Sequence, residues 1–76
     1  MEHVSQFKGK PNLFICQDYD GDLWVQSYET IVARIDSETN ELIELGKWSA
    51  TTTRHCKFVA REMNLTYVPA TNKETY

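Results

Sequence analysis

The short spacing between its apolar runs limits this chain to an antiparallel sheet. Four runs have the length and the β-branched or aromatic content of strands: residues 12–17, 23–28, 30–35 and 41–45. No more than five residues separate one run from the next, whereas two parallel strands need a crossover of about a dozen residues or more. Asp20-Gly21 is a tight-turn signal, and the polar segment 36–40 is another. The runs therefore predict a four-stranded antiparallel meander.

The hydrophobic period changes at Ser49. The segment from Ser49 to Met63 has no Gly or Pro, and its apolar residues Cys56, Val59, Ala60 and Met63 recur at helical spacing. This stripe should pack on the open face of the sheet, because hairpins alone are marginally stable in water. Residues 65–68 could add a short fifth strand. The expected fold class is α+β, with one C-terminal helix packed on one face of the sheet.

The 76 residues suffice for one domain. We expect a flexible N-terminal arm over residues 1–11, a single ββββα domain over residues 12–68 and a flexible C-terminal tail over residues 69–76. The sequence shows neither a signal peptide nor an apolar run long enough to span a membrane. We therefore expect a cytoplasmic protein without membrane association, with Cys16 and Cys56 as buried, reduced thiols.

Charge is divided unevenly along the chain. Residues 1–46 carry three basic and nine acidic side chains, a net charge of −6, and residues 47–76 carry five basic and two acidic ones, a net charge of +3. An acidic sheet region is thus joined to a basic helix region. Such a polarity can steer a partner, and the acidic part weighs against a general nucleic-acid binder.

The segment that opens the helix, residues 48–55, is rich in hydrogen-bonding groups. Ser49 or Thr51 is the expected N-cap, because hydroxyls satisfy the free amides of a first turn. Together with these amides, Thr51, Thr52, Arg54 and His55 could hold a phosphate or a carboxylate. The alternative is a simple cap, with Arg54 in solvent and His55 packed on the sheet.

The helix face opposite the apolar stripe is basic. Arg54, Lys57 and Arg61 share it, and Phe58 lies beside them. An aromatic side chain among cations favours a contact surface for a protein, a second copy of the chain or a nucleic-acid backbone. The alternative is a solvated face with Phe58 covering a sheet edge. The predicted binding residues are Thr51, Thr52, Arg54, His55, Lys57, Phe58 and Arg61.

Signals for catalysis and metal binding are weak. Asp18, Asp20, Asp22 and Glu29 match four positions of a calcium loop, but the turn glycine that such a loop requires is replaced by Leu23. A hairpin turn explains the acidic cluster better. The chain has no catalytic motif and no zinc-ligand spacing. We therefore expect no enzyme activity, no metal and no cofactor. Of the large aromatic side chains Trp24, Tyr28 and Trp48, at least one should be partly exposed.

Two motifs resemble those of small uncharacterised proteins of phages and prophages. One is the strand Ser27-Tyr28-x-Thr30-x-Val32-Ala33-x-x-Asp36, and the other is Trp48-Ser49-x-Thr51-Thr52-x-x-His55 at the start of the helix. The similarity extends over residues 12–63. It implies a phage-encoded accessory protein of the host cytoplasm, and it marks none of these residues as catalytic.

The expected function is therefore non-catalytic binding to a protein partner, including inhibition of a host or defence factor. Two alternatives stay open. One is a nucleic-acid-binding module that uses Lys47, Arg54, Lys57 and Arg61. The other is a structural component that self-assembles through a sheet edge.

Overall fold

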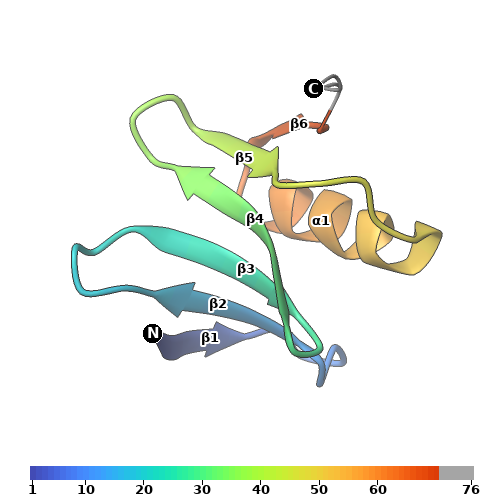
Figure 1. The fold of residues 1–76 in the computed structure, drawn as a ribbon, viewed down its shortest axis with the longest axis horizontal. Helices are drawn as coiled ribbons and strands as arrows, with labels where there is room; N and C mark the ends of the chain where they lie inside the picture. The colour runs from blue at the N-terminus through green and yellow to red at the C-terminus, as the bar shows by residue number, and fades with distance from the viewer. Residues whose placement is uncertain (71–76) are drawn as a thin grey trace.

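The computed structural model describes residues 1–70, which form one six-stranded sheet and one helix (Figure 1). The elements in chain order are β1 (Glu2–Gln6), β2 (Leu13–Gln17), β3 (Leu23–Ser27), β4 (Thr30–Asp36), β5 (Glu41–Glu44), α1 (Ala50–Glu62) and β6 (Thr66–Val68). The strands lie side by side in sequence order. The α+β class, the mainly antiparallel sheet and the single helix are confirmed. The sheet has more strands than the four of the predicted meander. One edge strand, β6, lies within residues 65–68, where a short fifth strand was considered, whereas the other, β1, was not expected.

The strand added at the N-terminal edge is β1, which falls within residues 1–11. The expectation of a flexible arm therefore does not hold for Glu2–Gln6. This segment pairs antiparallel with β2, from Glu2 opposite Gln17 to Gln6 opposite Phe14, with a register shift between His3 and Ser5. All five of its side chains are exposed, so no alternation of apolar and polar residues marks it in the sequence. Strand pairing with β2 and the stacking of His3 on Phe14 hold it in place.

The strand added at the opposite edge is β6, which pairs parallel with β5. The argument against parallel pairs fails here, because α1 itself is the crossover that joins these two strands. The expected flexible tail begins at residue 69, but residues 71–76 lie outside the described residues.

The hydrophobic core lies between α1 and one face of the sheet. It contains Leu13, Ile15, Val25, Val32, Ala33, Ile35 and Leu42 from the strands and Cys56, Val59 and Ala60 from the helix. Three of the four predicted stripe residues are thus buried. Met63 is not, because it is the C-cap of the helix and remains 36% exposed.

Within residues 1–70, the opposite face of the sheet has no helix on it. Strand alternation and register place both apolar and polar residues there: Phe14, Cys16, Trp24, Ile31, Ile43 and Val68, and His3, Gln6, Gln26, Arg34, Asp36, Glu41 and Thr66. None of these residues belongs to the core under α1. We call this surface the helix-free face. The two cysteines are free thiols, as expected, and they are on opposite sides of the sheet, Cys16 on the helix-free face and Cys56 on α1.

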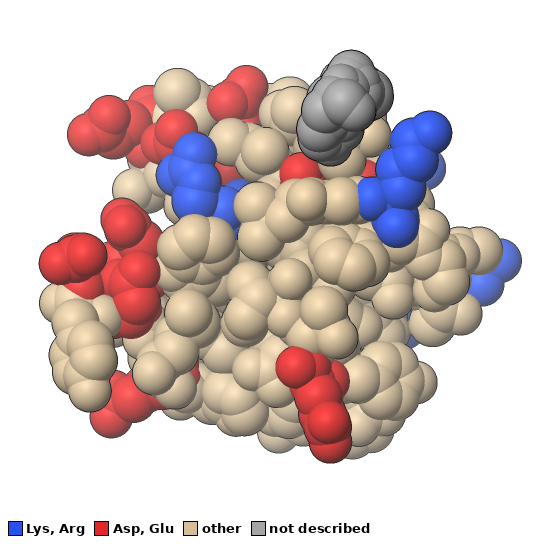
Figure 2. Space-filling model, in the orientation of Figure 1, with Lys and Arg blue, Asp and Glu red and all other residues tan. Residues whose placement is uncertain are grey.

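Negative charge is concentrated at one end of the molecule. Figure 2 shows acidic side chains around the end of the sheet that carries the β2–β3 and β4–β5 turns, whereas most Lys and Arg side chains visible in that view are on the side of α1. Among residues 1–70, no helix combines the length and apolar character needed to span a membrane.

Candidate protein-binding surface

The start of α1 is a cap anchored to the sheet. Ser49 is the N-cap, and its hydroxyl accepts a hydrogen bond from the backbone N–H of Thr52 at 3.3 Å. One residue earlier, the indole Nε1–H of Trp48 donates to the carbonyl oxygen of Val32 at 3.0 Å. A Cβ on Gly46 would lie 3.3 Å from the Trp48 ring, so the absence of a side chain there lets the chain turn closely around the indole. The cap and the indole fix where the helix begins on the sheet.

His55 is held against the end of β3. A hydrogen bond of 2.8 Å joins its Nδ1 atom to Oγ of Ser27, which is 3% exposed. Burial of the imidazole lowers the pKa of His55, and the positive charge of Lys10 lowers it further. His55 is therefore neutral at pH 7, which agrees with the alternative in which it packs on the sheet.

Tyr28 extends from the two-residue turn between β3 and β4, and its side chain is 55% exposed. Its φ angle is +57°, a left-handed conformation that costs a residue other than glycine about 1–2 kcal/mol. Its N–H donates to the carbonyl of Asn12 at 2.7 Å, and its carbonyl accepts from Nε2 of Gln26 at 2.7 Å. Its ring is stacked on His55 with a centroid distance of 6.2 Å. The backbone of Tyr28 is thus held by two hydrogen bonds, and its exposed ring has His55 as a stacking neighbour.

Phe58 lies on α1, one turn after His55, and its ring is between two cations. Nζ of Lys10 is 5.1 Å from the centroid of its ring and Cζ of Arg61 is 5.9 Å from it, both within the range of a cation–π contact. Phe7 packs edge-on at 5.4 Å. Phe58 is therefore half-buried under the loop between β1 and β2, and the cations remain at the surface.

These side chains form one continuous patch, which we call the Tyr28–Phe58 surface. Its members are Lys10, Tyr28, His55, Phe58 and Arg61. Of the residues predicted from sequence, the structure brings together His55, Phe58 and Arg61. Arg54 is exposed on the same helix, whereas Nζ of Lys57 lies over the ring of Tyr67, 5.5 Å from its centroid. Thr51 and Thr52 belong to the capped first turn.

Two members of this surface, Lys10 and Tyr28, were not among the predicted site residues. Lys10 lies in the segment expected to be an arm, so no sequence pattern placed it near the helix. Tyr28 did leave a signal. A two-residue hairpin loop favours Asn or Gly where φ is positive, and a tyrosine there is unusual.

The acidic turn after β2 is explained by hydrogen bonds within the hairpin. The carboxylates of Asp18, Asp20 and Asp22 approach within 4.8 Å of one another. Asp18 accepts from the N–H groups of Asp20 and Asp22 through Oδ1 and from the indole of Trp24 through Oδ2. The indole bond and the backbone bonds lower the pKa of Asp18. The cluster thus contains a structural carboxylate that shapes the turn, consistent with the hairpin interpretation.

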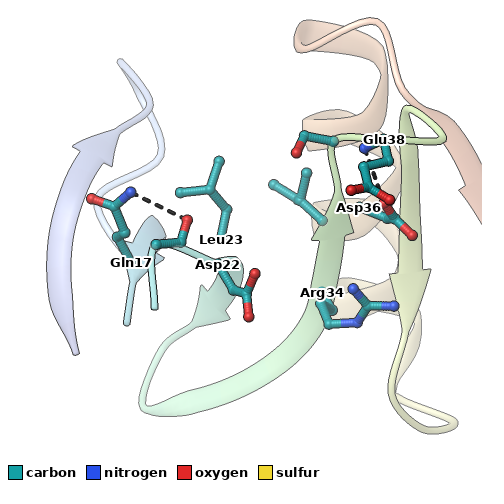
Figure 3. A pocket seen from close by; sticks show the side chains of 9 residues that line it. Gln17, Asp22, Leu23, Arg34, Asp36 and Glu38 are labelled. Atoms are coloured by element: carbon teal, nitrogen blue, oxygen red, sulfur yellow. Dashed lines mark hydrogen bonds between the residues drawn. The ribbon is translucent and has the colours of Figure 1, made fainter. Parts of the chain in front are cut away.

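A shallow hollow of about 340 Å³ lies between the β2–β3 and β4–β5 turns (Figure 3). Asp22, Arg34, Asp36 and Glu38 line it together with few apolar groups. Small-molecule sites are mostly apolar, and Asp36 already accepts the N–H of Glu38 at 3.0 Å. This lining gives little support to a small-molecule site.

A buried carboxylate lies between the sheet and the helix. Glu44 is 8% exposed, and its Oε1 atom accepts from the N–H of Ala70 at 3.4 Å. Burial raises the pKa of Cys56 to about 12, and the nearby carboxylate of Glu44 contributes. The same two causes raise the pKa of Tyr67. Cys56 is therefore a protonated, inert thiol rather than a nucleophile.

The chain was compared with protein families, curated proteins and solved structures. One family model matches residues 1–74, almost the whole chain. The chain belongs to this family of unknown function (DUF8033). No curated protein and no solved structure gives a significant match. Membership of DUF8033 thus assigns no activity to the chain.

Proposed function

We propose that this DUF8033 protein is a small accessory protein that acts by non-catalytic binding to another protein, through the Tyr28–Phe58 surface. The observation that carries the proposal is the exposed ring of Tyr28, on a backbone that two hydrogen bonds hold in the left-handed conformation. Hot spots of protein interfaces are enriched in Tyr and Arg, and an anchor that is already ordered loses less entropy on binding. Backbone strain kept at an exposed position favours a functional role for the side chain.

The charge of the surface indicates the kind of protein it fits. Lys10 and Arg61 lie over the ring of Phe58, and the ring of Tyr28 is stacked on His55. Arg54, next to His55 on α1, is exposed. A partner with an acidic surface and a pocket or groove for an aromatic ring would be complementary. The resemblance to phage proteins makes host proteins, including defence factors, the first class to test.

The experiment is affinity capture from a host lysate with three forms of the protein. Tyr28→Asn removes the ring and places a residue that tolerates positive φ in the turn, so the fold should be retained. Tyr19→Asn is the matched control, because Tyr19 is fully exposed in the acidic turn. We expect one stoichiometric partner with the wild type and with Tyr19→Asn, and its loss with Tyr28→Asn. Equal capture by all three forms, or no stoichiometric partner at all, would contradict the proposal.

Nucleic acid is the alternative ligand of the same surface. Phe58 between two cations fits a base stacked beside a phosphate backbone. Such binding should weaken steeply as salt increases. Fluorescence anisotropy with a single-stranded oligonucleotide at low salt distinguishes nucleic-acid binding from protein binding. Our proposal predicts no binding of the oligonucleotide, whereas binding that Arg61→Ala abolishes would support the alternative.

A further inference from the structure

The helix-free face of the sheet has an unusual composition for a surface in water. An antiparallel sheet with one solvated face normally alternates apolar residues inside with polar residues outside. Here the outer row of side chains runs across all six strands, from His3 through Cys16, Trp24, Arg34 and Ile43 to Val68. In a second row, Gln6 and Gln26 alternate with Phe14 and Ile31. So many apolar residues on a second face are typical of a sheet that is covered on both sides.

The described part of the chain covers only one of these faces. Helix α1 packs on the core side, and the side chains of Trp24, Ile31, Ile43 and Val68 remain partly exposed. Trp24 is also fixed in orientation, because its indole donates to Asp18 at 3.0 Å. The face therefore presents partly exposed apolar side chains among polar ones, with one of the largest, Trp24, fixed in orientation.

The charged groups on this face favour a second copy of the same chain. Arg34 lies in the middle of the outer row, between Trp24 and Ile43 in register. Glu41 is on the same face, two residues from Ile43, near the acidic end of the sheet. Asp36 is on this face too, opposite Glu41 in register. A two-fold axis close to Arg34 would place the guanidinium of each copy beside the carboxylates of the other. A face with both an arginine and a carboxylate around an apolar centre is complementary to itself.

The size of the face agrees with a weak dimer. Six strands at the usual spacing span about 29 Å, and a strand of about five residues is about 17 Å long. The flat area is then about 500 Å² per copy. Two copies bury about 1,000 Å², which is the lower bound for a specific interface. A larger partner would extend beyond the sheet, whereas a second sheet of this size matches it.

From these observations we infer that the helix-free face is the interface of a homodimer, in which two sheets pack face to face. Two stacked sheets lie about 10 Å apart, with their side chains interdigitated. This inference is independent of the partner-binding surface. The ring of Tyr28 packs on His55 of α1, and the ring of Phe58 packs on Phe7 and Lys10 of the loop between β1 and β2. Each dimer would then present two copies of the Tyr28–Phe58 surface.

Sedimentation equilibrium of the purified protein, from low micromolar to several hundred micromolar concentration, tests the dimer. We expect the apparent mass to rise from 8.9 kDa toward twice that value. Ile43→Lys should keep the mass at that of the monomer throughout. Met63→Lys, a matched change at an exposed apolar residue of the helix C-cap, should behave as the wild type. A wild type that stays monomeric, or an Ile43→Lys variant that still dimerises, would overturn the inference.

A charge swap tests the two-fold pairing even if Ile43→Lys unfolds. Arg34→Glu and Glu41→Arg should each weaken the dimer by at least tenfold, and the double variant should regain most of the affinity. Circular dichroism shows whether each variant is folded. If the double variant dimerises no better than the single ones, the proposed face-to-face arrangement is wrong.

Discussion

The imidazole of His55 and the hydroxyl of Ser27 are joined by a hydrogen bond of 2.8 Å between the first half of α1 and the end of β3. The two residues come from two sequence motifs, one over residues 27–36 and the other over residues 48–55. The second link between the motifs is the bond from Trp48 to the carbonyl of Val32. The two motifs therefore form the junction at which hydrogen bonds join the helix to the sheet, and Tyr28 lies beside this junction.

Loss of the Ser27 hydroxyl should destabilise this junction. In Ser27→Ala, Nδ1 of the half-buried His55 has no partner, so we expect the free energy of unfolding to fall by about 1–2 kcal/mol. Urea unfolding followed by circular dichroism measures the change. Ser5→Ala, at an exposed position of the edge strand β1, is the control and should have almost no effect. Equal stability of the two variants would argue against a structural role for the bond.

The protein should lose stability as the pH falls through the titration of His55. Burial and Lys10 place the pKa of His55 in the folded state below the ordinary value of 6.5. The unfolded chain therefore binds more protons between these two pKa values, and stability decreases with decreasing pH. Urea midpoints from about pH 7.5 down to about pH 5 should fall for the wild type and change less for His55→Gln. A wild-type midpoint that is constant over this range, or the same slope in both proteins, would contradict the assignment.

Of the three carboxylates in the turn after β2, we expect only that of Asp18 to be required for stability. Asp18→Asn leaves a single carbonyl oxygen to accept from two backbone N–H groups and the indole of Trp24. We expect a lower melting temperature and a change in tryptophan fluorescence. Asp20→Asn removes a charge from the same turn but leaves this hydrogen-bond network intact, so it should change the melting temperature little.

Calcium should not stabilise the protein, because hydrogen bonds within the hairpin already account for the acidic turn. We expect millimolar calcium to leave the melting temperature of the wild type unchanged. A clear increase would indicate a metal site.

Neither cysteine should react while the protein is folded. Burial raises the pKa of Cys16, and burial with the nearby Glu44 raises that of Cys56 to about 12. A thiol reagent near pH 8 should modify both at least about 100-fold more slowly than free cysteine. In concentrated guanidinium chloride both should react at once. Fast modification of Cys56 in the folded protein would show that α1 opens readily.

Sequence patterns predicted the parts of the fold in which burial decides the structure. The alternation in β2 to β5 and the spacing of Cys56, Val59 and Ala60 both reflect packing into one core. The strand β1 has no such pattern, because all its side chains are exposed and its position depends on strand pairing and on the contact of His3 with Phe14. The site was predicted in part for the same reason. His55, Phe58 and Arg61 follow from helical spacing, whereas the contact of Lys10 with Phe58 depends on how a loop from another part of the chain folds over the helix.

Site-specific photo-cross-linking tests the central claim, that this protein binds a partner through the ring of Tyr28, most directly. A photoreactive phenylalanine derivative would replace Tyr28 in one protein and Tyr19 in another, and each would be irradiated in the host lysate. We predict one dominant adduct of defined mass from position 28 and none of that mass from position 19. Adducts of the same pattern from both positions, or none from position 28, would contradict the claim.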